Sequence, residues 1–268
     1  WAFWPDQTDS LAQRDTGWVQ LYVESAQEAL DSVPQAFRVA EQALLPVMIN
    51  LDAFYVSHAM EPVDVPAQED VDAYLPPFAP AQRLDTAVGS SWGNVVSQDM
   101  FYRHRQALQE AMERVPRLLA QADGEWQQRF GRGWGVVERY RCDGAQAVIV
   151  TMGSMAGTAR EAVDAMRDAG EPVGLVRLRL FRPFPAAALR AALDGVRDAV
   201  VLDRNHSPGV GGILHQELRA ALCGVPGAPR VHGLLAGVGG VNVPPGRIVA
   251  FVRAARDAEP TAASQWVR

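Results

Sequence analysis

The sequence predicts an α/β fold in which the strands of a parallel sheet alternate with helices. The first observation is a near-continuous apolar run from Leu45 to Leu51, which is typical of a buried parallel strand. The second is a capping box, in which Ser25 and Glu28 mark the start of a helix upstream of that run. The third is the regular alternation of apolar runs and helical segments from about residue 139 onward.

The first half of the chain contains one strand–helix–strand unit and then a change of character. Residues 18–23 form a short apolar strand, and we expect Pro34 to interrupt or kink the helix that follows the capping box. Residues 62–80 hold five prolines and several acids, which indicates an ordered surface connection. Residues 98–130 have the pattern of an amphipathic helical arm, which we expect to break near Pro116.

The second half predicts a self-contained α/β unit with helices on both faces of a parallel sheet. Its expected strands are Ala147–Thr151, Val173–Phe181, Ala199–Leu202 and Val231–Leu235. Its expected helices are Thr158–Ala169, Ala186–Leu193, Gly212–Leu222 and a last one opened by Pro244 and Pro245. We therefore expect two domains, residues 1–135 and residues 136–268.

The bulk composition is that of an ordinary globular protein, and it excludes several classes of function. The 268 residues carry a net charge of −6, whereas a nucleic-acid-binding protein normally presents a basic face. All 25 residues counted as Lys or Arg are arginine, so neither a Schiff-base lysine nor a phosphate-loop lysine is available. The five histidines show no metal-ligand spacing, and no metal site is expected.

The cysteine content favours a reducing, cytoplasmic location. Cys142 and Cys223 are too few and too far apart to hold an iron–sulfur cluster or a disulfide framework. No apolar run reaches the roughly 20 residues that a membrane-spanning helix needs. The chain opens with Trp1 rather than Met, so the sequence does not decide whether a targeting segment precedes it.

A family resemblance lies in residues 6–18, Asp-Gln-Thr-Asp-Ser-Leu-Ala-Gln-Arg-Asp-Thr-Gly-Trp. They resemble a signature of the alpha subunit of the 2-oxoacid:ferredoxin oxidoreductase (pyruvate:ferredoxin oxidoreductase) family, an Asp-His-Ser-Asp-like element followed by Arg-Asp-Thr-Gly-Trp. Gln7 stands here in place of the histidine. Four later strings are similar to the second domain of the same subunit, although Val241-Asn242 replaces an Arg-Asp pair: Val148–Ser154, Leu178–Pro185, Val201–Arg204 and Gly237–Gly240.

The resemblance implies a fold and a reaction. Residues 1–135 would be the remainder of a thiamine-diphosphate pyrimidine-binding domain with a helical arm, lacking its N-terminal part. Residues 136–268 would be a transketolase C-terminal-like domain. The family reaction is the oxidative decarboxylation of a 2-oxoacid, pyruvate or a bulkier or aromatic one, to acyl-CoA. Thiamine diphosphate supplies the attacking carbanion, coenzyme A is the cosubstrate, and electrons pass through iron–sulfur clusters to ferredoxin or NAD.

The same resemblance implies partner subunits. A beta subunit would bind the diphosphate and Mg, and gamma and iron–sulfur delta-type subunits would complete the enzyme. Two alternatives stay open. One is a transketolase-like or oxoacid dehydrogenase E1 component, which shares the domain order. The other is a non-catalytic scaffold subunit of such a complex.

The family's catalytic residues would precede Trp1, so the resemblance assigns no catalytic acid or base to this chain. It places Trp1, Phe3 and Trp4 at the pocket for the oxoacid side chain. Their rings would favour a bulky or aromatic substrate by stacking, or would instead fill the pocket and leave room only for pyruvate. Core packing near the chain start is the structural alternative.

Polar residues elsewhere have competing interpretations. Asp6, Asp9, Arg14 and Asp15 would form a network that fixes the active-site loop, or would only cap and pair at the entry to a strand. Asp52 and His58 follow a strand end and are interpreted as polar groups where the two domains meet. The glycine-rich residues 207–212 would cradle a phosphate or, more simply, make a tight turn into a helix.

Overall fold

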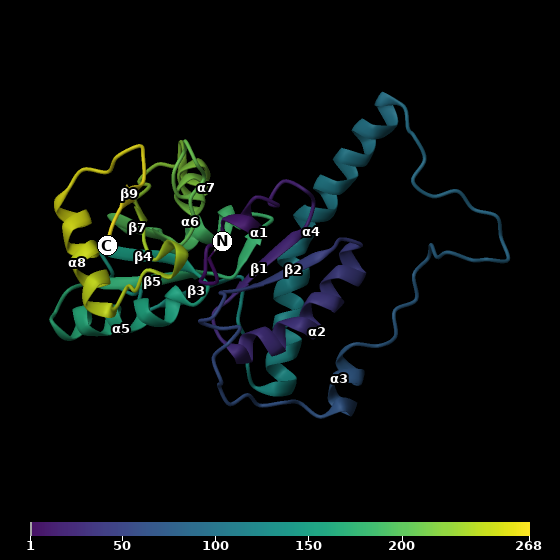
Figure 1. Cartoon of the computed structure of the whole chain (residues 1–268), viewed down its shortest axis with the longest axis horizontal. Helices are drawn as coiled ribbons and strands as arrows, with labels where there is room; N and C mark the ends of the chain where they lie inside the picture. The colour runs from purple at the N-terminus through teal and green to yellow at the C-terminus, as the bar shows by residue number, and fades with distance from the viewer. Residues whose placement is uncertain (1) are drawn as a thin grey trace.

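A computed structural model describes residues 2–268 as two β-sheets flanked by helices (Figure 1). The small sheet has the strand order β2-β1-β6, and the large one the order β3-β5-β4-β7-β8-β9. In chain order the first elements are α1 (Thr8–Leu11), β1 (Val19–Val23), α2 (Ala26–Ala43), β2 (Val47–Leu51), α3 (Gln68–Tyr74), α4 (Gln98–Phe130) and β3 (Val137–Tyr140). They are followed by β4 (Ala147–Met152), α5 (Met155–Asp168), β5 (Val173–Leu178), β6 (Leu180–Arg182), α6 (Ala186–Ala192), β7 (Asp198–Asp203), α7 (Ile213–Leu222), β8 (Arg230–Leu235), η1 (Val238–Gly240), α8 (Pro245–Asp257) and β9 (Gln265–Trp266).

The small sheet packs against α2 and α4. β1 is fully buried and pairs in parallel with β2, from Val19 opposite Val47 to Val23 opposite Leu51. β2 is less buried than its apolar sequence predicts, because it lies at the edge of the sheet and its residues are half-buried or exposed. The expected parallel direction is thus confirmed, but the expected burial is wrong.

Both proline-containing helices are continuous. α2 runs through Pro34 and α4 runs through Pro116, so the expected interruption at Pro34 and the expected break near Pro116 are wrong, and a kink at Pro34 stays a prediction. A proline inside a helix removes one backbone hydrogen bond and crowds the preceding turn. The extensive packing between α2 and α4 offsets that cost, since their facing sides carry buried Val39, Val115 and Leu119.

The large sheet has the expected parallel core. β5, β4, β7, β8 and β9 are parallel neighbours, and the added edge strand β3 pairs antiparallel with β5. α5 and α8 cover one face and α6 and α7 the other, because the apolar side chains of these helices belong to two separate core clusters. The continuous apolar sequences of β4 and β7 follow from this burial on both faces.

Residues 173–181 were expected to form one strand, but they contribute to both sheets. The chain leaves the large sheet after Leu178, and β6 then pairs antiparallel with β1 in the small sheet. Arg179 lies at the crossing point and is completely buried. A strand from the second half of the chain therefore ties the two sheets together.

Arg177 and Arg179 share a buried carboxylate on α2, and each has another acidic partner, Glu138 and Asp123 respectively. Glu28 is 2.6 Å from Arg177 and 3.0 Å from Arg179, and all three side chains are almost completely inaccessible. Arg179 also donates to Ser32 at 2.8 Å and to Gln35 at 2.9 Å. The sequence predicted only the capping role of Glu28. The cap is present, since the Glu28 backbone N–H donates to the Ser25 hydroxyl at 3.2 Å, and the Glu28 carboxylate accepts from the Glu24 backbone N–H at 2.9 Å.

The N-terminal half of α4 and the connection before it project from the body of the protein (Figure 1). The connection over residues 62–80 is a surface segment that also contains the unexpected helix α3. Further along, exposed apolar side chains include Trp92, Val95 and Phe101. No helix in the described part of the chain is both long and apolar enough to cross a membrane.

Replacing Glu28 with Gln should destabilise the protein strongly. It removes the carboxylate that faces Arg177 and Arg179, which leaves two guanidiniums in the interior with too little negative charge. We expect the free energy of unfolding, measured by chemical denaturation at pH 7, to fall by about 3–5 kcal/mol. Asp143→Asn, at a fully exposed carboxylate paired with Arg139, is the control and should change stability little. Equal small losses in both variants would show that the buried cluster is dispensable.

Candidate functional site

A cavity of about 640 Å³ lies between the first residues of the chain and the carboxyl end of β2. Phe3, Trp4, Asp6 and Asp9 line it, and their site roles stay predictions. Trp1 lies outside the described residues. The position agrees with the general rule that open α/β sheets bind ligands beyond the carboxyl ends of their strands.

The four charged residues expected to act together are divided between two places. Asp6 accepts hydrogen bonds from the backbone N–H and hydroxyl of Thr8, and Asp9 accepts one from the Ser10 backbone. Arg14 and Asp15 instead line a separate groove of about 530 Å³ beside α4, where Arg182 and Glu217 are their ionic neighbours. The structure thus brings Asp6 and Asp9 to the cavity, and it places Arg14 and Asp15 elsewhere.

At the buried end of the cavity, the Asp52 carboxylate is the centre of a hydrogen-bond network. Its carboxylate accepts from Gln7 Nε2 at 3.0 Å, from the Ser154 backbone N–H at 2.8 Å, and from the Ser154 hydroxyl at 2.6 Å. Arg204 Nη1 donates to the same carboxylate at 3.0 Å. Four separate parts of the chain therefore meet at one buried carboxylate.

Local backbone geometry makes this meeting possible. Gly153 has a φ of 66°, and a Cβ atom there would lie 2.8 Å from both Asp52 Oδ2 and Gln7 Nε2. Glycine at this position therefore lets the strand end approach the carboxylate. The N-terminal segment is also tied to the second half by backbone bonds, from Gln7 N to Arg204 O and from Gly239 N to Pro5 O, each 3.0 Å long.

The outer wall of the cavity is aromatic. Trp4 and Phe3 both contact Phe54, which follows Asp52 on the loop after β2. Tyr55 lies on the other side of that loop, where its ring is 5.0 Å from the Arg204 guanidinium and its hydroxyl donates to the Gly240 carbonyl at 3.1 Å. The sequence indicated Phe3 and Trp4 but not Phe54 or Tyr55, because only folding brings the loop after β2 against the start of the chain.

The glycine-rich loop before α7 is a turn whose backbone donors are already used. Asp203 accepts from the N–H groups of Leu214 and His215, each at 3.0 Å, and Asn205 accepts from that of Ile213 at 2.8 Å. Burial raises the pKa of Asp203 to about 6 and lowers the pKa of His215 to about 4. The N-terminus of α7 is thus capped internally, which favours the turn interpretation over a phosphate cradle.

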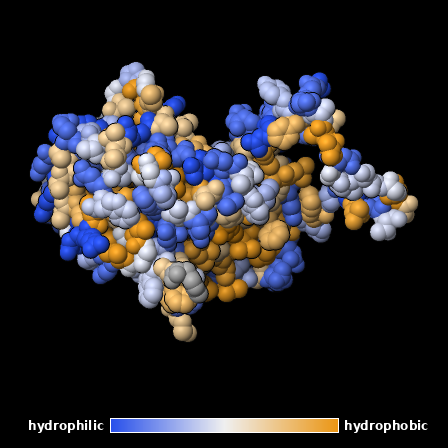
Figure 2. Space-filling view, turned by 45° about the horizontal axis from the view of Figure 1, so that its top comes forward, coloured by the Kyte–Doolittle hydropathy of each residue, from blue (hydrophilic) through white to orange (hydrophobic). Residues whose placement is uncertain are grey.

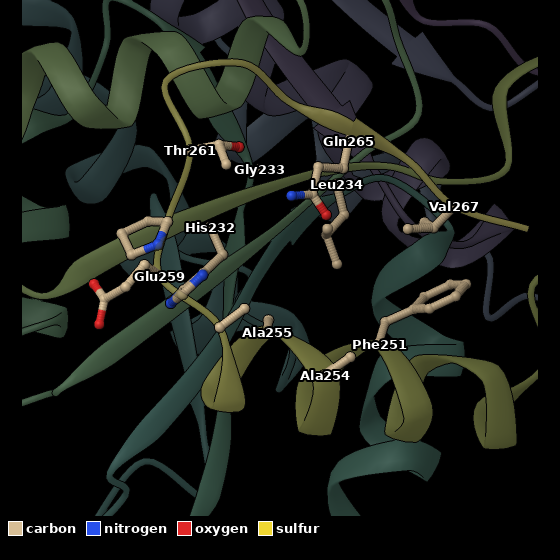
Figure 3. Close-up of a pocket in the computed structure, with 12 residues that line it drawn as sticks. His232, Gly233, Leu234, Phe251, Ala254, Ala255, Glu259, Thr261, Gln265 and Val267 are labelled. Carbon is tan, nitrogen blue, oxygen red and sulfur yellow. The ribbon is translucent and has the colours of Figure 1, made fainter.

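A second, smaller cavity of about 240 Å³ lies between β8, α8 and the C-terminal segment (Figure 3). Its lining is mostly apolar, with Leu234, Phe251 and Val267 beside His232. The His232 ring is already paired with the buried Asp198 carboxylate at 3.2 Å. This cavity lies on the flank of the large sheet, away from Asp52 and from the aromatic wall.

The residues of the larger cavity suit a neutral, planar group better than an anionic one. Gln7 Oε1 is a buried acceptor without a partner at the inner end, and aromatic rings form the outer wall. The charged residues that line the cavity are all acidic, so they repel a diphosphate. Across residues 2–268, no group of three or more His, Cys, Asp and Glu side chains is arranged to hold a metal ion.

Two family models match the chain. Residues 1–123 match the thiamine diphosphate-binding domain of pyruvate flavodoxin/ferredoxin oxidoreductase, and residues 145–248 match pyruvate:ferredoxin oxidoreductase core domain II. The sequence is 42% identical to pyruvate synthase subunit PorA of Methanothermobacter thermautotrophicus, over 99% of this chain and 68% of that protein. It is 40% identical to ketoisovalerate oxidoreductase subunit VorA of Pyrococcus abyssi, over 90% of this chain and 61% of that protein.

A solved structure supports the same fold. A chain of 2-oxoglutarate:ferredoxin oxidoreductase from Magnetococcus marinus superposes with a TM-score of 0.59 and 16% identity, over 94% of this chain and 46% of that chain. The match of the N-terminal half to a thiamine diphosphate-binding domain defines the class, a subunit of the type found in thiamine diphosphate-dependent enzymes. More particularly, the chain belongs to the 2-oxoacid:ferredoxin oxidoreductase family and corresponds to its alpha subunit. It spans about two thirds of the length of its curated relatives.

Asp52→Asn should loosen the N-terminal segment. The substitution keeps the side chain's size but removes the charge that faces Arg204, and it replaces one acceptor oxygen with a donor. We expect the free energy of unfolding to fall by about 2–4 kcal/mol, with faster hydrogen exchange at the backbone of Gln7. Asp85→Asn, in the exposed connection before α4, is the control. Unchanged exchange at Gln7 in Asp52→Asn would mean that other contacts hold the segment in place.

Proposed function

We propose that this chain works as a subunit of an enzyme that oxidatively decarboxylates a 2-oxoacid to acyl-CoA and passes two electrons to ferredoxin or NAD. The observation that carries the proposal is its 42% identity to a pyruvate synthase subunit over 99% of the chain. The cavity beyond β2 supports it, because an open cavity with an aromatic wall lies in the matched N-terminal domain. When bound, thiamine diphosphate supplies the carbanion that attacks the keto carbon.

Within that enzyme, we assign this chain the substrate-side wall of the cofactor cleft. Phe3 and Trp4 would pack against the side chain of the oxoacid, while Gln7 would accept a hydrogen bond from a neutral donor on a bound group. The relatives include proteins named for pyruvate and for ketoisovalerate, so both small and branched substrates are consistent with the family. We propose pyruvate or a bulkier 2-oxoacid as the substrate.

We assign the remaining cofactors to partner subunits. The acidic lining does not suit a diphosphate, so a beta subunit would bind the diphosphate and Mg, and gamma and iron–sulfur delta-type subunits would complete the enzyme. Coenzyme A would be the cosubstrate.

We also propose that the chain divides into two domains near residue 135. Asp6, Asp9, Arg14 and Asp15 would shape the loop that runs between the cavity and the groove beside α4. A cytoplasmic location fits the two free thiols.

The distribution of polar and apolar side chains around α2 supports a partner subunit that covers the outward face of this helix. Its inward side carries buried Glu28 and Asp31, whereas its outward side carries Val33 and Phe37, with 46% and 56% of their surface exposed, and Leu44, just after the helix, is 75% exposed. The space-filling view shows hydrophobic surface gathered on one face of the molecule (Figure 2). An apolar stripe beside the open edge of β2 is typical of a surface that another polypeptide covers.

The function is tested with the complex purified from its native source. We expect reduction of a dye acceptor that requires both coenzyme A and thiamine diphosphate, and that responds to at least one of pyruvate, 2-oxoisovalerate and phenylglyoxylate. Omitting coenzyme A separates this enzyme from a transketolase-like component, which would not need it. A complex that oxidises no 2-oxoacid would contradict the proposal and favour a scaffold role.

Phe37→Glu should weaken assembly without unfolding the subunit. The side chain is more than half exposed, so a charge is tolerated in the free chain but not in a dry interface. We expect affinity for the partner subunits to fall at least about tenfold, seen as loss of co-purification. Gln42→Glu, on the same helix, is the matched control. Normal assembly of Phe37→Glu would exclude this side of α2 from the interface.

A further inference from the structure

Phe54 is the centre of a cluster of four rings behind the larger cavity. Its ring lies between Trp4, with centroids 5.1 Å apart and planes 14° apart, and His58, with centroids 4.3 Å apart and planes 12° apart. Phe3 meets the same ring edge-on, with centroids 5.7 Å apart. Phe3 and Trp4 line the cavity, whereas Phe54 and His58 do not, so Phe54 supports the wall from behind.

The backbone at Phe54 is held in a conformation that a phenylalanine avoids. Its φ is 62°, in the left-handed region, and such residues persist only where surrounding contacts enforce them. Here the Phe54 N–H donates to the Ser57 hydroxyl at 3.1 Å. The Val56 N–H donates to the Asp52 carbonyl at 2.9 Å. This tight turn begins at Asp52, whose carboxylate is itself fixed by Gln7, Ser154 and Arg204.

The opposite side of Trp4 is also fixed, by the second half of the chain. A Cβ atom at Gly240 would lie 2.3 Å from Trp4 Cβ, so the indole segment rests directly on the Gly240 backbone. Trp4 nevertheless exposes 46% of its surface, and Phe3 exposes 53%. Stacking against Phe54 therefore adds a contact that helps to set the angle of these half-exposed rings.

We infer that Phe54 is a positioning residue that sets the substrate side-chain preference of the enzyme by fixing the angle of Phe3 and Trp4. The inference rests on the proposed function, since it needs a 2-oxoacid in the cavity. Phe54 does not touch the substrate; it acts through the two rings that do. Removing its ring takes away one contact from each of Phe3 and Trp4, so both rings can shift and change the room left for the substrate side chain.

The test compares Phe54→Leu, Phe54→Gly and Phe54→Tyr in the assembled holoenzyme. The measured quantity is the ratio of kcat/KM for pyruvate to kcat/KM for phenylglyoxylate. We expect the Leu and Gly variants to shift this ratio by about three- to tenfold, mainly through KM, because pocket shape discriminates on this scale. The Tyr variant keeps the ring and should stay within about twofold of the parent enzyme.

Three further results make the test decisive. Phe251→Leu, a Phe-to-Leu change in α8 beside the smaller cavity, should leave the ratio unchanged. His58→Gln removes one face of the stack at an exposed position, so it should fold normally and shift the ratio in the same direction as Phe54→Leu. A shift in Phe54→Gly alone would attribute the effect to the backbone and overturn the role of the ring.

Different results would contradict the proposed function and the role of Phe54. If the parent complex oxidises no 2-oxoacid, the proposed function fails. If the parent complex is active and both Phe54→Leu and His58→Gln keep the parent ratio, the proposed function stands and only the role of Phe54 is overturned.

Discussion

The buried contact of Glu28 with Arg177 and Arg179 is the constraint on which the rest of the structure depends. One carboxylate on α2 faces two guanidiniums that come from the point where the chain leaves the large sheet for the small one. Buried charges are tolerated only when they are paired and hydrogen-bonded, so the position of α2 and the path of residues 177–182 are fixed together. The two sheets cannot be placed independently while this cluster is intact.

The cavity is a consequence of that arrangement. Once the sheets are tied, the end of β2 lies beside the ends of β4 and β7, and Asp52 reaches Ser154 and Arg204. The first residues of the chain then pack across this junction, through Gln7 on the polar side and Trp4 on the aromatic side. The site is therefore shaped by both halves of the chain, although its lining comes almost entirely from the first half.

Much of the fold follows from local sequence. The capping box at Ser25, the apolar runs of β4 and β7, and the paired prolines before α8 each indicate their element correctly, because these signals act over a few residues. Local rules fail where long-range packing outweighs them. Pro116 does not break α4, since contacts with α2 stabilise the helix on both sides of it. The apolar residues 173–181 gave no sign of dividing between two sheets.

The sequence by itself determined the α/β class, most of the strands and helices, and the family. Only the tertiary structure decided which side chains share a site. It separated Arg14 from Asp6, joined Gln7 to Arg204, and placed Phe54 behind Trp4. The physical reason is that helix and strand patterns depend on neighbours a few positions apart, whereas a site depends on strand ends that are far apart in sequence and meet only after the sheets have packed.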